Sequence, residues 1–546
     1  MSIGSKETPA EIQARIEAEP LPDNLGALLD FAVERYAKRP AWIDVDPEGA
    51  ALTYQQLNEL VARSANAFAA LGVRKGTHVG VMLPNVPESL AAWLALARLG
   101  ACLIPINPGF TPAELRYGLT DGDAEWLLLD GECVATFDEM HESGPVIDRS
   151  RLVTYGDRSV DGLSRWSEML AAVAPVFTPN EPVGLDDIVN IQYTSGSTGM
   201  PKGCLLSHRY WLQCGKMLSE VWPKFDRIQC DLPFYYLGPF WRFCVAAFQG
   251  GALCVPPNYS LSRFRQRVRD YKYDMAWMTD PVAMQPPDPI EKDNCLKMIA
   301  TFGLSKTLHR SVEERFGVPA RDTFGMTEVG FTAYVPLDAS DMVGSGSCGI
   351  VAPFREMMVA TPEGEPLPYG QTGELCIRGH GIFKGYYKKP EVTAAAFHQN
   401  WFRSGDLAYQ DERGYFYIVG RIKDMVRRSG ENISVTEVES VLSTLPSIME
   451  VAVHGVKDEM RGEEVKACVI LREGQSPQTM SPETIIAHCR QHLARFKVPR
   501  YVQFYSAFPK TGSSKIAKKR LVDGEGVTVS ETFDVSTGNW LAGAAK

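Results

Sequence analysis

The chain has 546 residues, of which 45% are hydrophobic and 22% are charged. These values are typical of a folded globular protein and exclude an intrinsically disordered chain. Lys and Arg total 56 while Asp and Glu total 66, so the net charge is −10, which argues against generic nucleic-acid binding. At about 150 residues per domain, the length predicts three or four domains, or one large domain with a small one.

The twelve cysteines lie between Cys102 and Cys489 and include no CxxC pair. This spacing disfavours a zinc ribbon or a thioredoxin-type site and favours free, buried thiols in a reducing compartment. The N-terminus is polar and lacks the apolar segment of a signal peptide. The longest apolar stretch, 90–106, contains Arg98 and is too short to span a bilayer. We therefore expect a cytoplasmic protein without a membrane span.

The first half of the chain alternates strand-like and helix-like patterns. Residues 78–83 are typical of a buried strand, and Pro87 then begins an apolar helix that ends at Gly100. Further strand patterns follow at 101–105 and 126–129. Strand, helix and strand at this spacing predict βαβ units and a parallel sheet.

A second region follows Gly420. Ser434, with Glu437 three residues on, predicts the capped start of a helix, and Ser481 before proline predicts another. Strand patterns at 451–456 and 465–471 lie between them. This order predicts a small α+β domain, whereas the Ser-, Thr- and Gly-rich residues beyond it predict a loose tail.

The strongest chemical signal is the segment YTSGSTGMPKG at 193–203, which follows a strand pattern at 188–192. Glycines allow backbone N–H groups to approach an anion, hydroxyls donate to phosphate oxygens, and Lys202 adds a positive charge. The alternative is a flexible Ser/Gly loop, which the ordered proline and lysine disfavour. A Walker loop is excluded because Pro201 precedes Lys202.

This segment resembles the phosphate-binding loop of the adenylate-forming superfamily, which includes acyl- and aryl-CoA synthetases, beetle luciferase and the adenylation domains of peptide synthetases. Six further motifs of that family appear in order, and the resemblance covers roughly residues 25 to 525. They lie at 324–328, 373–375 with 384–387, 404–407, 420–424, 429–433 and 509–516.

The resemblance implies an α/β fold class with a large N-terminal domain of layered sheets and helices and a small, mobile α+β C-terminal domain. The expected segments are a large ATP- and acyl-binding domain over 1–420, a lid domain over 421–527 and a tail over 528–546. Lys423 resembles the hinge residue of related ligases.

The ATP-binding residues that the resemblance implies are Thr194, Ser195, Gly196, Ser197, Thr198, Gly199, Lys202, Gly303, Phe324, Gly325, Met326, Asp406 and Arg421. Phe324 stands where the family usually has tyrosine, and its ring can still stack on adenine. Asp406 is expected to accept the ribose hydroxyls, and Arg421 to contact the ribose or a phosphate. Read without the family, Asp406 is a cap or a surface charge.

Three residues are expected to act in catalysis. By resemblance, Thr327 meets the α-phosphate and Glu328 holds Mg²⁺, a cation that prefers oxygen ligands and shares substrate phosphates. Lys515 resembles the lysine that screens the repulsion between a carboxylate and the triphosphate. The alternative for Lys515 is a solvated cationic face. Ser514 departs from the family, which most often has glycine there.

The acyl pocket is expected at Tyr235, Tyr236 and Trp241, with Tyr236 in place of the usual histidine. Such rings can wall a flat or alicyclic acid, or cage a quaternary ammonium group, although an aromatic packing cluster is an equal alternative. CoA is expected to contact Gly430, Arg427 and Arg428, the two arginines being surface charges in the alternative.

These residues predict an ATP-dependent acyl-CoA ligase that uses ATP, Mg²⁺ and coenzyme A, with a small carboxylic acid as partner and a possible homodimer. Three alternatives stay open: an enzyme that loads an acyl carrier protein, an oxygenase of the luciferase type, and a non-catalytic acyl- or nucleotide-binding homologue. The sequence does not name the acid.

Overall fold

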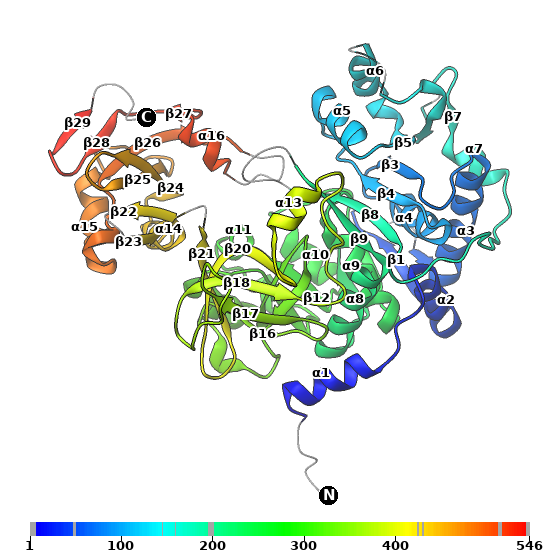
Figure 1. Cartoon of the computed structure of the whole chain (residues 1–546), viewed down its shortest axis with the longest axis horizontal. Coiled ribbons are helices and arrows are strands. Elements are labelled where there is room, and N and C mark those ends of the chain that lie inside the picture. Colours follow the sequence, from blue (N-terminus) through cyan, green and yellow to red (C-terminus); the bar gives the residue numbers. More distant parts are fainter. Residues whose placement is uncertain are drawn as a thin grey trace, which may run out of the picture. The chain divides into compact units, whose positions relative to one another are not determined.

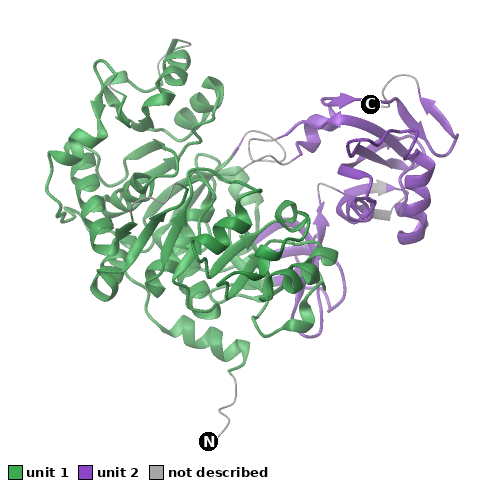
Figure 2. Ribbon diagram, turned by 180° about the vertical axis from the view of Figure 1, so that it is seen from behind, with its two compact units in different colours: residues 1–194, 202–357, 377–401 green, residues 195–201, 358–376, 402–546 purple. Residues whose placement is uncertain are grey.

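The structure is a computed structural model that describes residues 7–46, 51–142, 144, 146–158, 160–194, 201–422, 425–428, 431–510 and 516–541. The chain divides into two compact units, coloured separately in Figure 2. Unit 1 contains residues 1–194, 202–357 and 377–401, and unit 2 contains residues 195–201, 358–376 and 402–546.

Unit 1 contains a mainly parallel sheet whose described strands lie in the order β7-β6-β5-β3-β4-β8-β9 (Figure 1). The strands are β3 (His78–Met82), β4 (Cys102–Pro105), β5 (Trp126–Asp130), β6 (Leu152–Tyr155), β7 (Ser164–Arg165), β8 (Ile188–Tyr193) and β9 (Gly203–Ser207). Only the pair of β8 and β9 is antiparallel within this described set. The expected βαβ units and parallel sheet are therefore confirmed.

Helix α4 (Pro87–Leu99) connects β3 to β4 and begins and ends as the sequence predicts. Proline occupies its first turn, where the missing N–H leaves no hydrogen bond unmade. Gly100 ends the helix with a φ of 68°, a left-handed conformation that glycine adopts without steric cost. Nearly the whole helix is buried, which explains its continuous apolar sequence.

A second sheet of unit 1 has its described strands in the order β2-β1-β11-β10-β12-β13-β14-β15-β16. They are β1 (Pro40–Asp44), β2 (Ala51–Thr53), β10 (Arg227–Gln229), β11 (Ala252–Val255), β12 (Met275–Met278), β13 (Met298–Thr301), β14 (Ala320–Met326), β15 (Gly330–Tyr334) and β16 (Ser347–Val351). Pairing is parallel from β1 to β14 and antiparallel from β14 to β16. The turn between β14 and β15 carries part of the motif at 324–328.

Helices α8 (His208–Val221) and α9 (Leu237–Gln249) pack against each other. The other helices of unit 1 are α1 (Pro9–Ala18), α2 (Leu25–Tyr36), α3 (Tyr54–Ala70), α5 (Pro112–Asp121), α6 (Val134–Glu142), α7 (Trp166–Ala171), α10 (Phe264–Asp270), α11 (Asp280–Ala283), α12 (Lys306–Phe316) and α13 (Pro390–Ala395).

One polar side chain joins three of these elements inside the core. The Oδ1 atom of Asn190 on β8 accepts hydrogen bonds from Trp93 Nε1 of α4 and Trp211 Nε1 of α8, both at 2.9 Å. All three residues are fully buried. The ring of Trp93 also lies 4.6 Å from that of Phe240 on α9. A single acceptor therefore fixes the orientation of two indoles against which α9 packs.

Unit 2 contains β22 (Met425–Arg428), β23 (Glu431–Ser434), β24 (Ile448–Asp458), β25 (Gly462–Leu471), β26 (Tyr501–Ala507), β27 (Val527–Thr528), β28 (Thr532–Asp534) and β29 (Asn539–Leu541) in one sheet. Its helices are α14 (Val435–Ser443), α15 (Pro482–His492) and α16 (Lys518–Val522). The side chain of Ser434 accepts from the Glu437 N–H and caps α14 as expected. Val438 and Ile485 on α14 and α15 pack with Val465 on the sheet in one core, so the expected α+β arrangement is confirmed.

Unit 2 also contains the paired strands β20 (Trp401–Gln410), all but its first residue, and β21 (Phe416–Arg421). Strands β17 (Glu356–Ala360) and β18 (Gly373–Arg378) cross the boundary between the units, and β19 (Phe397–His398) belongs to unit 1.

The expectation of a loose tail is wrong for its described part. Strand β28 pairs with β26, and β29 pairs with β28. Phe533 is buried, and the Asp534 carboxylate binds the Arg500 guanidinium at 3.1 Å. Strands of three residues are too short to show a hydrophobic period in the sequence, so their pairing depends on tertiary contacts.

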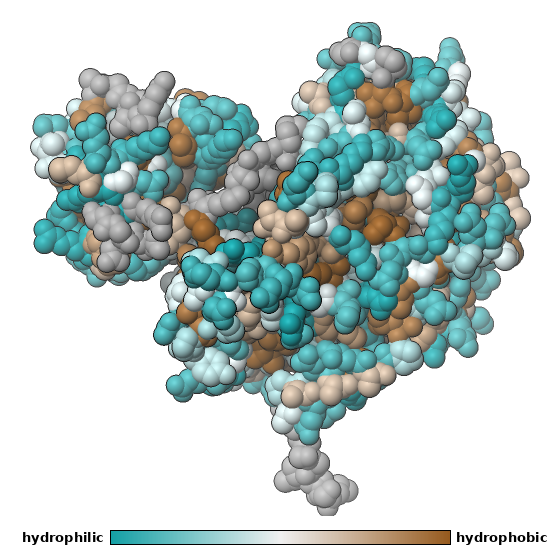
Figure 3. Space-filling model, viewed as in Figure 1, coloured by the Kyte–Doolittle hydropathy of each residue, from teal (hydrophilic) through white to brown (hydrophobic). Residues whose placement is uncertain are grey.

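The remaining general expectations concern thiols and membranes. All twelve cysteines are free, and all except Cys295 are buried, as expected. None of the described helices has the length and hydropathy needed to cross a bilayer. In Figure 3, hydrophilic residues make up most of the visible surface of unit 1, with smaller hydrophobic patches between them.

We predict that Asn190→Leu destabilises the protein by about 2 kcal/mol or more, because two buried indole N–H groups lose their acceptor. Urea unfolding followed by circular dichroism measures this. The control is Gln266→Leu, at an exposed position of α10. Equal midpoints for the two variants would contradict the role assigned to Asn190.

Candidate active site

The glycine-rich segment is described at both of its ends. Tyr193 on β8 lies opposite Gly203 on β9, and the Thr194 N–H donates to the Lys202 carbonyl at 3.0 Å. The Oγ1 atom of Thr194 is buried and has no hydrogen-bond partner among the described residues. A buried hydroxyl without a partner is free to donate to a ligand oxygen.

Several predicted site residues lie outside the described residues. They are Ser195, Gly196, Ser197, Thr198, Gly199, Lys423, Gly430 and Lys515, together with the side chain of Arg427.

Lys202, Tyr386 and Glu328 form a connected polar group in unit 1. The ammonium of Lys202 lies 4.1 Å from the ring centre of Tyr386, and the Tyr386 hydroxyl donates to Glu328 Oε1 at 2.8 Å. Glu328 is buried, with 8% of its surface exposed. Burial, and then the negative charge of Glu328, raise the pKa of Tyr386 far above its usual value. The phenol therefore stays protonated at neutral pH and keeps donating to the carboxylate.

Residues 324–328 end strand β14 and enter its turn to β15. Gly325 lies opposite Phe331, and a Cβ on Gly325 would come within 2.5 Å of the Gly330 carbonyl oxygen. Gly330 has a φ of 67°, in the left-handed region that glycine tolerates. The close pairing of these glycines holds Thr327 and Glu328 at the tip of the turn, where Thr327 is half-buried.

The buried guanidinium of Arg355 holds this turn in place through hydrogen bonds to the residues around it. Its Nε donates to the Val329 carbonyl at 2.9 Å, Nη1 donates to Gln213 Oε1 at 3.0 Å, and Nη2 donates to the Gly381 carbonyl at 3.1 Å. Arg355 is 1% exposed. Burial lowers its pKa, although an arginine remains charged in a protein. Sequence reasoning missed Arg355, which stands in none of the family motifs.

Gly303 follows strand β13 in an exposed turn with a φ of 64°. The buried carboxylate of Asp322 accepts the Leu304 N–H at 3.2 Å and the Thr301 hydroxyl. Burial raises the pKa of Asp322, and the hydrogen bond from Thr301, followed by the nearby His309, opposes that shift. These contacts hold the Gly303 turn beside β14, the strand that carries Phe324.

The predicted acyl-pocket residues separate into two places. Tyr235 and Tyr236 precede α9 and are half-buried, and their ring centres lie 4.7 Å apart. Trp241 is buried on α9, and its ring lies 4.7 Å from Phe331 and 5.6 Å from Trp277. Trp241 belongs to a set of rings that we call the ring cluster. Its members are Trp222, Trp241, Trp277, Phe302 and Phe331.

Sequence reasoning found only Trp241 in this cluster. Phe331 lies three residues after Glu328, and Phe302 immediately precedes Gly303, so the motifs that contain those two site residues could have indicated both rings. Trp277 has no such signal, because it reaches the cluster through the pairing of β12 with β13.

In unit 2, the two residues expected near the ribose lie together. Asp406 on β20 faces Arg421 on β21, and Arg421 Nε donates to Asp406 Oδ1 at 2.9 Å. The Asp406 side chain is 5% exposed, whereas the Arg421 side chain is 48% exposed. The pair places a buried carboxylate beside an accessible guanidinium, which suits a ligand carrying hydroxyl or phosphate groups.

Arg428 of unit 2 is engaged inside the protein. Its Nε lies 2.8 Å from Glu464 Oε2, and its Nη1 donates to the Phe496 carbonyl at 2.9 Å. Glu464 is fully buried and also pairs with Arg461 at 3.1 Å. The Arg428 side chain is 13% exposed, so most of its surface is already covered by the protein.

The described residues hold no cluster of three or more His, Cys, Asp or Glu side chains that could bind a metal ion. Glu328 is the single carboxylate of the Lys202–Tyr386–Glu328 group. One carboxylate is compatible with Mg²⁺, which is often held by one or two carboxylates and substrate phosphates.

The sequence profile of the AMP-binding enzyme family matches residues 29–387, and that of the AMP-binding enzyme C-terminal domain matches residues 437–515. The chain belongs to the AMP-binding enzyme family. The expected adenylate-forming family and α/β fold class are therefore confirmed.

Among relatives of this AMP-binding enzyme, crotonobetaine/carnitine–CoA ligase from Citrobacter koseri is 32% identical over 522 residues, which cover 91% of this chain and 98% of the relative. The ligase of the same name from Salmonella paratyphi C is 32% identical over 517 residues, with the same coverage.

Among solved structures, ATP-bound MatB from Rhodopseudomonas palustris is 26% identical, with a TM-score of 0.81, covering 92% of this chain and 99% of MatB. Anthranilate CoA ligase AuaEII with anthranoyl-AMP has a TM-score of 0.80 at 23% identity, covering 93% and 98% of the two chains, and supports the fold.

We predict that Arg355→Met destabilises this AMP-binding enzyme by about 3 kcal/mol, because buried acceptors at Val329, Gln213 and Gly381 lose their donors. Differential scanning calorimetry measures the loss. Arg378→Met is the matched control, since the Arg378 side chain is 41% exposed and pairs with Glu356 at the surface. Similar melting temperatures for the two variants would refute the role of Arg355.

Proposed function

We propose that this enzyme activates a bulky carboxylic acid with MgATP and transfers the acyl group to coenzyme A. The acid's carboxylate oxygen attacks the α-phosphorus, forming acyl-AMP and releasing pyrophosphate. The CoA thiol then attacks the acyl carbon, giving a thioester, and AMP leaves with the bonding electron pair. The protein is an AMP-forming acid–thiol ligase. The observation that carries the proposal is the match to both family profiles along one chain.

We assign the phosphates of ATP to the glycine-rich segment. The residues assigned are Thr194, through its hydroxyl, Ser195, Gly196, Ser197, Thr198, Gly199 and Lys202. The buried hydroxyl of Thr194 without a partner supports this assignment. Phe324, Gly325, Met326 and Gly303 are assigned to the adenosine. Thr327 is assigned to the α-phosphate.

Glu328 is the proposed ligand of Mg²⁺, which would neutralise charge on the phosphates. The Tyr386 hydroxyl donates to one of its two oxygens and orients the carboxylate. Because the phenol stays protonated, it keeps this hydrogen bond without adding a charge beside the carboxylate.

In unit 2, the Asp406 carboxylate is the proposed acceptor of the ribose hydroxyls, with Arg421 beside it. Lys515 is the proposed lysine of the adenylation step and Lys423 the proposed hinge, both from sequence motifs alone. Gly430 and Arg427 are proposed near CoA. For Arg428, the contact with Glu464 supports a role in holding β22 against β25.

The thiols and the sequence also support a cytoplasmic location, and a homodimer is proposed on family grounds alone. The second candidate function, the runner-up, is transfer of the acyl group to an acyl carrier protein in place of CoA. It stays open because the adenylation step is the same in both reactions.

The decisive measurement is pyrophosphate release over a panel of acids, with and without CoA. We predict acyl-CoA formation, with cyclic acids exceeding acetate in kcat/KM, because each CH₂ left unburied forfeits about 0.8 kcal/mol. Highest kcat/KM for acetate would contradict the bulky-acid assignment. Acyl-AMP that reacts with a carrier protein and not with CoA would favour the runner-up.

We further predict that Glu328→Gln lowers acyl-AMP formation by about 100-fold, as is typical when one charge-stabilising group is removed, and raises the Mg²⁺ concentration needed. Tyr386→Phe removes only the orienting donor, so it should raise the Mg²⁺ requirement by a smaller factor. Single-turnover rates at varied Mg²⁺ test both. The control is Glu356→Gln, an exposed carboxylate of unit 1. Wild-type rates at limiting Mg²⁺ would exclude Glu328 as the ligand.

A further inference from the structure

The ring cluster contains a buried positive charge that the family motifs do not account for. Arg242, next to Trp241 on α9, has its guanidinium carbon 4.7 Å from the ring centre of Trp241 and 5.4 Å from that of Trp277. Only 2% of Arg242 is exposed. Its Nε and Nη1 atoms are buried without a hydrogen-bond partner among the described residues.

A buried guanidinium without a partner lowers the stability of the folded state, because the charge loses its hydration and two N–H donors make no hydrogen bond. Burial lowers the pKa of Arg242, while Cys230 and Asp231 oppose that shift, and the side chain keeps its charge. The two tryptophan faces compensate part of the desolvation through cation–π contacts. An anion brought to Nε or Nη1 would supply the missing acceptor.

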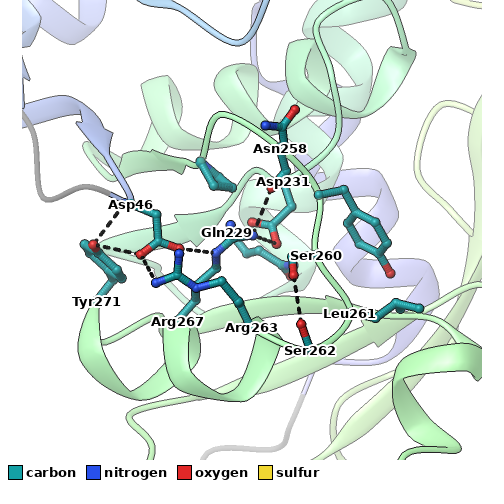
Figure 4. Close-up of polar contacts among 12 residues, drawn as sticks. Asp46, Gln229, Asp231, Asn258, Ser260, Leu261, Ser262, Arg263, Arg267 and Tyr271 are labelled. Atoms are coloured by element: carbon teal, nitrogen blue, oxygen red, sulfur yellow. Dashed lines mark hydrogen bonds and ion pairs between the residues drawn. The ribbon is translucent and has the colours of Figure 1, made fainter.

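The neighbouring carboxylates are already engaged by other arginines, as Figure 4 shows for Asp46 and Asp231. Arg267 lies between them, with its Nε 2.7 Å from Asp46 and its Nη1 3.4 Å from Asp231. Arg263 takes the other Asp46 oxygen at 2.7 Å. Arg263 and Arg267 thus engage both carboxylates, and no ion pair joins Arg242 to either of them among the described residues.

Asp231 is itself in an unfavourable position for an isolated charge. It is 3% exposed, and its Oδ1 has no partner within the described structure. Burial raises its pKa, against the side-chain hydrogen bond with Gln229 and the charges of Arg267 and Arg242. With Asp231 ionised, the three arginines and two aspartates named above carry a net positive charge. With Asp231 protonated, that positive charge is larger.

The cluster lies beside residues assigned to ATP. Phe302, whose ring is 4.3 Å from Trp277, adjoins Gly303. Phe331, whose ring is 4.7 Å from Trp241, lies three residues after Glu328. The rings therefore connect the proposed adenylation centre with the Arg242 guanidinium.

We propose that the ring cluster is the acyl subsite and that Arg242 receives a second, non-reacting carboxylate, so that the substrate is a cyclic dicarboxylic acid. This inference rests on the proposed function. The substrate ring would lie among the aromatic side chains while the reacting carboxylate meets ATP. Of the two acid types that the aromatic segment predicts, a cationic acid is disfavoured, because its ammonium would meet a like charge at the same ring faces.

Gly238 provides the space for this arginine. A Cβ at Gly238 would lie 2.6 Å from Arg242 Nη1, so Gly238→Ala is expected to displace the guanidinium without removing its charge.

The test compares acids that share one ring: benzoate, isophthalate and terephthalate, and 3-(trimethylammonio)benzoate as the cationic probe. Pyrophosphate release with each acid gives kcat/KM. We expect wild type to prefer a dicarboxylate over benzoate by about 100-fold, in the range for a charge-assisted contact inside a pocket. Arg242→Gln should reduce that ratio by a similar factor, and Gly238→Ala should reduce it in the same direction.

Arg263→Gln is the matched control, because it also removes a guanidinium. The Arg263 side chain is 49% exposed and pairs with Asp46. This variant should leave the ratio unchanged. Wild type preferring benzoate or the cationic acid would overturn the inference, as would an unchanged ratio in Arg242→Gln. Should Arg242→Gln fail to fold, the wild-type ratios and Gly238→Ala still decide. Pyrophosphate release with no acid, here or in the wider panel, would instead overturn the proposed function.

Discussion

The buried guanidinium of Arg355 is the contact on which the candidate site of unit 1 depends. It satisfies carbonyl groups from two separate segments and the side chain of Gln213 on α8. The turn that carries Thr327 and Glu328 is short and glycine-rich, and it has little apolar surface of its own to bury. A charged fork with several acceptors gives this turn a defined position that packing alone would not provide.

Near that turn, the protein holds two charged side chains whose burial costs different amounts of free energy. Glu328 is buried beside a neutral donor, Tyr386, and Lys202 lies on the face of the same ring. This arrangement keeps an anion and a cation close to each other without a direct ion pair between them. Among the described residues neither Lys202 nor Glu328 forms a salt bridge, so neither charge has to be released from one before it contacts a ligand.

Local signals made much of the fold predictable. Gly100 and the apolar run before it defined α4, and Ser434 and Ser481 marked the starts of α14 and α15. Such signals act within a few residues, so one sequence contains them. The tail strands β28 and β29 were missed because their pairing depends on residues far away in the chain.

The residues of the candidate site also divide into those that the local sequence predicts and those that depend on distant parts of the chain. Motif residues such as Glu328 and Asp406 were recognisable because their order along the chain is distinctive. Arg355, Trp277 and Arg242 stand outside the motifs and reach the site only through tertiary packing. The continuous apolar sequence around Arg242 is typical of a buried helix. It does not indicate what the guanidinium contacts, because Trp277 lies on a strand that is distant in the sequence.

The contact between Gly238 and Arg242 has a consequence for redesign. Because a methyl group at 238 would collide with the guanidinium, the two positions form one unit of change. Transplanting Arg242 into a homologous pocket whose equivalent of Gly238 carries a side chain would force the guanidinium into a different position. Transfer of the proposed acyl subsite to a relative therefore involves both positions, and single-site libraries across α9 would not sample that combination.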